Sequence, residues 1–330
     1  RDWKPQNYSE KFFGPTRLRE AMVNSRNLVS IRLLREIGIP YAMDYITSFG
    51  FGPSELPDNL SMALGSASLI PLSIARGYAT FANGGYLIDP YFIERILDAK
   101  GVVRFVASPQ LVCEDCEFDQ DSDSDLLEPV EKVEPSFRPL QLETEEDLMV
   151  VEQETSEVQD MVAQPTPAPR VISEQNAFLI RSMMMDVVRR GTGKKAMELG
   201  RNDLAAKTGT TNEQRDAWFS GYNNEIVTSV WVGFDSHEPL GRNEVGGKAA
   251  LPIWIDFMRV ALDGVPEQAP EIPEGITQAR IDPDTGLLAR IENREAIVEV
   301  FDMGSLPPME EPIEGDQADA VTEEDPYDSF

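Results

Sequence analysis

Residues 204–234 read LAAKTGTTNEQRDAWFSGYNNEIVTSVWVGF and hold the clearest secondary-structure pattern of the chain. Short runs rich in apolar, aromatic and β-branched residues lie at 204–210, 217–222 and 226–234, and polar segments separate them. Runs of this length between tight polar turns are typical of an antiparallel meander. The stretch therefore predicts three consecutive antiparallel strands.

Helices are expected on both sides of this stretch. A helix capped by Ser173 and ended at Gly191 precedes it, and an amphipathic helix at 252–262 follows it. Earlier in the chain, helical spacing recurs at 18–22 with Thr16 as cap, at 28–37 before Gly38 and Pro40, at 41–49 and at 71–83. The pattern predicts an α/β (α+β) fold in which an antiparallel sheet is covered by helices.

Two smaller units are expected outside this sheet. A hairpin is predicted from 86–97 and 102–106, with its turn at 98–101. A second small unit is predicted around 276–288.

Acidic residues give the 330-residue chain a formal net charge of −29. Residues 113–160 hold 18 acids against Lys132 and Arg138, and residues 301–330 hold 10 acids and no base. The other 252 residues carry only −3, so the acidity is typical of a solvated insertion and a solvated tail. No basic patch remains, which excludes a nucleic-acid-binding protein.

Composition divides the chain into four parts. They are a helical part at 1–112, an acidic, proline-rich insertion at 113–170, the sheet with its closing helix at 171–264, and a C-terminal extension with an acidic tail at 265–330. The sequence shows neither an apolar run of about 18 residues nor a signal-peptide pattern at its start. Because it begins without Met, we expect a C-terminal piece of a longer protein, with any membrane anchor outside these residues.

The chain has two cysteines, Cys113 and Cys116, in the sequence VCEDC. Thiols at this spacing can close a local disulfide, serve redox exchange or supply half of a zinc site. Zinc needs two more ligands, and the single histidine, His237, is distant in sequence. We favour a local disulfide or two unreactive thiols, and expect neither a metal nor a cofactor.

Common catalytic patterns are weak or absent in this sequence. A Ser-His-Asp or Cys-His mechanism would rest on His237, which lies in the polar loop DSHEP. The glycines of 191–195 follow a helix and lack the spacing of a phosphate-binding loop.

The strand AAKTGT at 205–210 carries the candidate site. Its small residues and Gly209 let another backbone approach, and Lys207 would place a cation beside an extended peptide. Thr208 and Thr210 share one face of the strand, so their hydroxyls can jointly hold a carboxylate. An ordinary edge strand whose lysine prevents aggregation is the alternative.

A second polar element, Ser25-Arg26-Asn27, separates two apolar helices. It is either a turn that faces a cleft or an N-cap of the second helix. A Ser-x-Asn element followed by Lys-Thr-Gly is typical of penicillin-binding proteins and class A β-lactamases. Longer stretches of sequence carry the same resemblance, at 14–21, 25–29, 77–85, 207–212 and 216–222. On these stretches the chain resembles the transpeptidase domain of class A penicillin-binding proteins. The acidic insertion resembles the 1A type.

The resemblance implies acyl transfer from D-Ala-D-Ala stem peptides of peptidoglycan, inhibited by β-lactams, at the periplasmic face of the inner membrane. Ser25 would relay a proton, Asn27 would orient the peptide, and Lys207 would polarise Ser25. Thr208 and Thr210, on either side of Gly209, would bind the terminal carboxylate, and the Thr210 N–H would form half of an oxyanion hole.

The nucleophile of the family is the serine of Ser-x-x-Lys, and no lysine of this chain has a serine three residues before it. In the family this motif lies upstream, so we expect an N-terminally truncated fold that cannot acylate by itself. A serine β-lactamase-like hydrolase and a noncatalytic interaction module are the alternatives.

Overall fold

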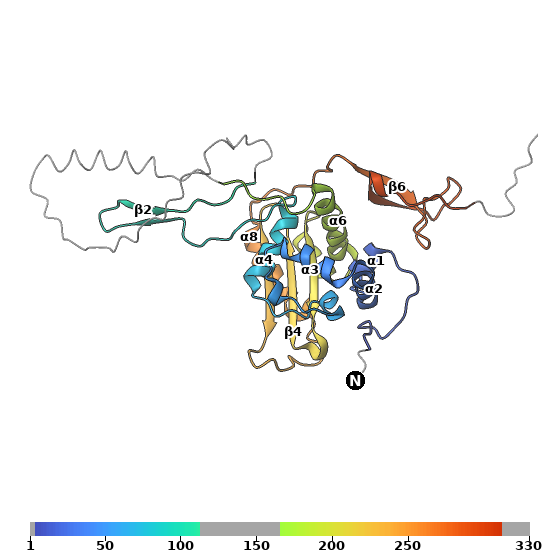
Figure 1. Cartoon of the computed structure of the whole chain (residues 1–330), viewed down its shortest axis with the longest axis horizontal. Helices are drawn as coiled ribbons and strands as arrows, with labels where there is room; N and C mark the ends of the chain where they lie inside the picture. Colours follow the sequence, from blue (N-terminus) through green and yellow to red (C-terminus); the bar gives the residue numbers. More distant parts are fainter. Residues whose placement is uncertain (1–3, 113–165, 312–330) are drawn as a thin grey trace, which may run out of the picture.

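The computed structural model describes residues 4–112 and 166–311 (Figure 1). Its centre is a sheet of three antiparallel strands in the order β3 (Ala205–Thr210), β4 (Asp216–Tyr222) and β5 (Val227–Gly233). The predicted meander is therefore confirmed, with strand bounds that differ by one residue. Lys207 on β3 lies directly opposite Ser220 on β4, and Ser220 lies opposite Ser229 on β5.

Helices recur through residues 4–112, the described portion of the first part of the chain. They are α1 (Leu18–Val23), α2 (Asn27–Ile37), α3 (Ile39–Thr47) and α4 (Pro71–Ala82), with single 3₁₀ turns η1 (Pro53–Glu55) and η2 (Leu60–Leu64) before α4. Thr16 was expected to cap α1, but Arg17 is the N-cap, and the Thr16 hydroxyl donates to the Gly14 carbonyl. Pro40 lies in the first turn of α3, where its missing N–H costs no helical hydrogen bond.

The helices around the sheet follow the prediction closely. In α6 (Glu174–Arg190), the Ser173 side chain accepts the N–H of Asn176, as expected of an N-cap. The short helices η3 (Lys194–Leu199), η4 (Asn212–Gln214) and α7 (Gly246–Ala249) lead to α8 (Leu251–Ala261), which matches the expected closing helix.

Side chains alternate between the two faces of the sheet, and each face has its own core. On one face Phe219 packs edge-on against Trp254 of α8, with ring centroids 5.0 Å apart and both side chains fully buried. On the other face Tyr222 packs with Met184 and Met185 of α6 and with residues of α4. Helices α4 and α8 thus cover opposite faces, and β3, which carries the candidate residues, is an edge strand of the described sheet.

Two hairpins lie outside this unit, on opposite sides of it in Figure 1. One pairs β1 (Arg95–Leu97) with β2 (Val103–Val106) around the expected turn. Its first strand is shorter than predicted and begins at Arg95, and the Leu87 N–H donates to the Pro169 carbonyl. Residues 166–170, which composition assigned to the insertion, therefore pair with the folded chain.

The other hairpin pairs β6 (Ile276–Ile281) with β7 (Ile297–Asp302), and η5 (Met303–Ser305) follows. The acidic tail was expected to begin at 301, but Phe301 lies opposite Thr277 and Met309 forms a bridge with Leu288. We call residues 276–310 the C-terminal unit. The division of the chain at 112, 170 and 264 stays a prediction.

Cys113 and Cys116 lie outside the described residues, so their pairing stays a prediction. Among the helices of residues 4–112 and 166–311, none combines the length and the apolar character needed to cross a membrane.

Candidate active site

Ser25 and Lys207 meet although they lie on distant parts of the sequence. Lys207 Nζ donates to Ser25 Oγ at 2.8 Å and to the Thr208 carbonyl oxygen at 2.9 Å. Ser25 lies in the turn between α1 and α2 with φ of 52°, a conformation that non-glycine residues rarely adopt. Backbone hydrogen bonds hold this turn, from Ser25 N–H to Met22 O and from Arg26 N–H to Ala21 O. Such strain is typical of functional sites.

The tripeptide Ser25-Arg26-Asn27 matches both readings in part, because it holds the N-cap of α2 and also carries the serine that Lys207 contacts. Arg26 is the N-cap of α2, and it makes no side-chain cap hydrogen bond. Asn27 is the first residue of α2, and its amide donates to the Gln6 carbonyl at 3.0 Å. Of the three polar residues that sequence analysis singled out for one cleft, the structure joins Ser25 and Lys207 by a hydrogen bond, whereas Asn27 is bonded to Gln6.

Burial lowers the pKa of Lys207 from 10.5 to about 8. The residue opposite it on β4, Ser220, is neutral and accepts a hydrogen bond from Ser229, and burial on this face raises the pKa of Tyr78 to about 12. Burial disfavours the charged ammonium, so the lysine loses its proton more readily than in water. Lys207 is therefore poised to change charge in the pH range where enzymes work.

Thr208 and Thr210 alternate with Lys207, so they lie on the other face of β3. The Thr208 hydroxyl lies 2.7 Å from that of Thr192, and the Thr210 hydroxyl accepts the Gly246 N–H at 3.0 Å. Each hydroxyl can still take part in one further hydrogen bond. The two side chains are thus fixed on one face, as predicted, with capacity to bind an anion.

Thr192 and the pair Gly246-Gly247 also support this site, and neither was predicted from the sequence. A Cβ on Gly246 would lie 2.2 Å from the Trp218 carbonyl oxygen and 2.4 Å from that of Gly209, so only glycine lets α7 approach the two strands. The adjacent glycines at 246–247 were the available signal. Thr192 lies in a glycine-flanked segment that does not fit a phosphate-binding loop, but its hydroxyl supports β3.

His237 is not part of this site. Its Nδ1 lies 3.5 Å from Asp216 Oδ2, and its side chain is 64% exposed. In the part of the chain that the structure describes, no three His, Cys, Asp or Glu side chains are grouped to hold a metal ion.

Comparison with known proteins decides the family. A family model of the penicillin binding protein transpeptidase domain matches residues 1–253. The chain belongs to the penicillin-binding protein transpeptidase family. The serine β-lactamase and the noncatalytic module are accordingly not favoured.

Curated members of this family match nearly the whole chain. It is 45% identical to penicillin-binding protein 1A of Pseudomonas aeruginosa over 306 residues, which cover 93% of this chain and 36% of that protein. It is 37% identical to penicillin-binding protein 1A of Escherichia coli over 330 residues, which cover 93% of this chain and 39% of that protein. The chain thus spans less than half the length of these relatives and corresponds to the transpeptidase region of the 1A type.

Solved structures of the transpeptidase family share the fold. The crystal structure of penicillin-binding protein 1A from Haemophilus influenzae superposes with a TM-score of 0.74 at 34% identity, over 92% of this chain and 42% of that one. PonA1 of Mycobacterium tuberculosis gives a TM-score of 0.58 at 22% identity, over 82% of this chain and 63% of that one. The predicted fold class, an antiparallel sheet covered by helices in the β-lactamase-like manner, is confirmed.

Proposed function

We propose that this chain forms one side of the acyl-transfer site of a peptidoglycan transpeptidase. A serine oxygen attacks the carbonyl carbon of a D-Ala-D-Ala peptide bond, the C–N bond breaks, and the departing D-Ala amine takes a proton. An amine of a neighbouring strand then attacks the ester, forms the cross-link and frees the serine. Membership of the transpeptidase family supports this reaction.

The hydrogen bond between Lys207 and Ser25 is the observation that carries the proposal. The lysine ammonium withdraws electron density from Ser25 Oγ, so this hydroxyl gives up its own proton more readily. Ser25 can therefore relay a proton between the nucleophile and the leaving amine. The nearby positive charge also stabilises the oxyanion that develops in the transition state.

The hydroxyls on the other face of β3 would bind the substrate. Thr208 and Thr210 would hold the terminal carboxylate of the stem peptide, or the carboxylate of a β-lactam. The Thr210 N–H would donate to the oxyanion. Asn27 would orient the peptide, for which its amide has to exchange Gln6 for the substrate.

The nucleophile and its lysine base would come from a Ser-x-x-Lys motif outside residues 1–330, which do not contain one. We accordingly propose that these residues alone do not form an acyl-enzyme. The intact transpeptidase would act on stem peptides at the periplasmic face of the inner membrane.

Covalent labelling by a fluorescent penicillin tests this function. The full-length protein, meaning the intact transpeptidase with the proposed upstream Ser-x-x-Lys motif, is expected to label stoichiometrically. A folded polypeptide of residues 1–330, checked by thermal unfolding, is expected to stay unlabelled. Stoichiometric labelling of residues 1–330 would point to a nucleophile within them. Absence of labelling in the full-length protein would overturn the proposed function.

A further inference from the structure

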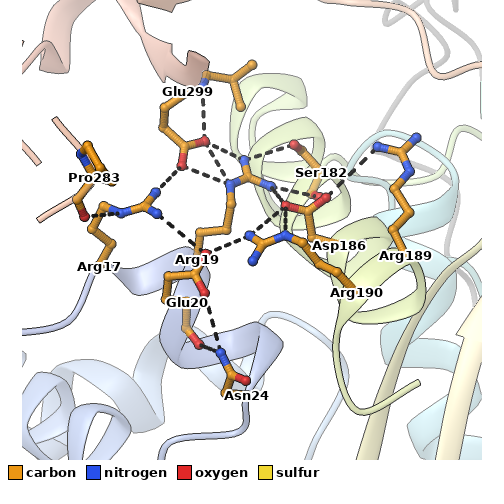
Figure 2. A network of polar contacts seen from close by, with 11 residues as sticks. Arg17, Arg19, Glu20, Asn24, Ser182, Asp186, Arg189, Arg190, Pro283 and Glu299 are labelled. Atoms are coloured by element: carbon orange, nitrogen blue, oxygen red, sulfur yellow. Dashed lines mark hydrogen bonds and ion pairs between the residues drawn. The ribbon is translucent and has the colours of Figure 1, made fainter. Parts of the chain in front are cut away.

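Two arginines of the phrase GPTRLREA at 14–21 have no part in the proposed reaction. Arg17 and Arg19, at the start of α1, reach the same carboxylate of the C-terminal unit, that of Glu299 on β7 (Figure 2). Arg17 Nη1 lies 3.3 Å from Glu299 Oε2, and Arg19 Nη2 lies 2.6 Å from Oε1. Arg17 Nε also donates to the Pro283 carbonyl at 3.1 Å, so each arginine is held at a defined place.

Arg19 also joins α1 to α6. Its Nη1 donates to the Ser182 carbonyl oxygen at 2.9 Å and lies 3.2 Å from Asp186 Oδ2. A second bridge between the same helices runs from Arg190 to Glu20, at 2.7 Å. The network in Figure 2 therefore connects α1, α6 and β7 through one short helix.

The charged groups of Arg17, Arg19 and Glu299 are largely shielded from solvent. The side chains of Arg19 and Glu299 are only 11% and 12% exposed, so their attraction is weakly screened. Neutralising Glu299 leaves Arg19 with Asp186 at 3.2 Å and Arg17 with Glu20 at 3.5 Å as acidic partners, so two shielded arginines share less negative charge. The loss of a carboxylate from such a shielded group is more costly than the loss of a surface ion pair. Glu299 balances the charges of both Arg17 and Arg19, so its loss affects the whole junction of α1, α6 and β7.

Helix α1 connects this junction to the candidate site. It has only six residues and no side-chain cap, so tertiary contacts must hold it in place. At its C-terminal end the Val23 carbonyl accepts the Thr192 N–H at 3.2 Å, and the Thr192 hydroxyl contacts Thr208. Ser25 follows two residues later. A shift of α1 therefore moves both Ser25 and the support of Thr208.

We propose that Glu299 is a positioning residue for the transpeptidase site, which holds α1, and with it Ser25, at the distance that Lys207 requires. Through this contact the C-terminal unit holds α1 in place and thereby contributes to the rate of acylation. This proposal rests on the proposed function.

The test compares Glu299→Gln with Glu295→Gln in the full-length protein. Both changes remove one negative charge from the C-terminal unit, but Glu295 is exposed and its backbone N–H, not its side chain, makes the local hydrogen bond. We expect Glu299→Gln to lower the maximal rate of penicillin acylation about 10-fold, because small displacements of catalytic groups are costly. The half-saturating penicillin concentration should change less than about twofold, since the groups that bind the carboxylate remain.

Amide hydrogen exchange gives a readout that does not depend on acylation. Residues 21–26 should exchange faster in Glu299→Gln than in Glu295→Gln. Equal acylation rates and equal exchange in the two variants would overturn the proposal, as would a loss of apparent affinity at an unchanged maximal rate. If Glu299→Gln fails to fold, Glu299→Asp, which keeps the charge on a shorter side chain, is expected to show the same pattern more weakly. If the unmodified protein does not acylate, the proposed function fails. Faster exchange of residues 21–26 in Glu299→Gln would still show that Glu299 holds α1 in place.

Discussion

Lys207 Nζ lies 2.8 Å from Ser25 Oγ, across 182 residues of sequence. One partner lies on an edge strand and the other in a strained turn between two helices. Burial lowers the pKa of the lysine to about 8, so the charge of this pair depends on pH near neutrality. We therefore expect this contact to set the pH dependence of acylation.

The pH dependence of acylation should report the charge of Lys207. Below about pH 8 the lysine is protonated, and above it the ammonium is lost. Because the charged form polarises Ser25, we expect the acylation rate of the full-length protein to fall as pH rises through about 8. In Lys207→Arg the guanidinium stays charged over this range, so the fall should disappear, whatever the absolute rate. A rate that increases through pH 8 would show instead that the neutral lysine is the active form.

Removal of the Thr208 hydroxyl should weaken binding of the β-lactam carboxylate. A hydrogen bond to a charged group contributes about 1.5–3 kcal/mol, so Thr208→Val is expected to raise the half-saturating penicillin concentration about 10- to 100-fold. Thr277→Val on β6 is the matched control and should have no effect. An unchanged half-saturating concentration in Thr208→Val would remove Thr208 from the proposed carboxylate site.

Gly246 should tolerate no side chain. A Cβ there would lie 2.2 Å from the Trp218 carbonyl oxygen, so α7 or the strands have to move. We expect Gly246→Ala to lower the free energy of unfolding by about 1–3 kcal/mol, the usual cost of overpacking. At Gly247 the corresponding approach to Thr192 O is 3.2 Å, so Gly247→Ala should have a smaller effect in urea denaturation. Equal effects would contradict the close packing of α7 on the strands.

The core on the α8 face should depend on Trp254 and much less on Phe257, three residues later on the same helix. Trp254 is fully buried and its Nε1 donates to the Thr228 carbonyl at 3.1 Å, whereas Phe257 is 52% exposed. Trp254→Ala is expected to cost about 3–5 kcal/mol of unfolding free energy. Phe257→Ala should cost only a small part of that, and a comparable loss would show that α8 is covered on its outer side.

Local patterns were sufficient to predict the sheet and the Ser173 cap, because strand alternation and capping depend on neighbouring residues. The sequence also placed Ser25 and Lys207 in one site, since each motif is local and the family resemblance joins them. Thr192 and Glu299 could not be found this way, because their partners are set by tertiary packing. Residues 301–310 were assigned to a solvated tail because acid content outweighed the apolar residues that continue β7.

The most direct test of the central claim is the second-order rate constant of penicillin acylation in full-length Lys207→Ala. If Lys207 polarises Ser25 and stabilises the transition state, this constant should fall by roughly 10² or more. Lys195→Ala, which removes an exposed lysine on η3, should acylate like the unmodified protein. Acylation of Lys207→Ala at the unmodified rate would contradict the assignment of the site.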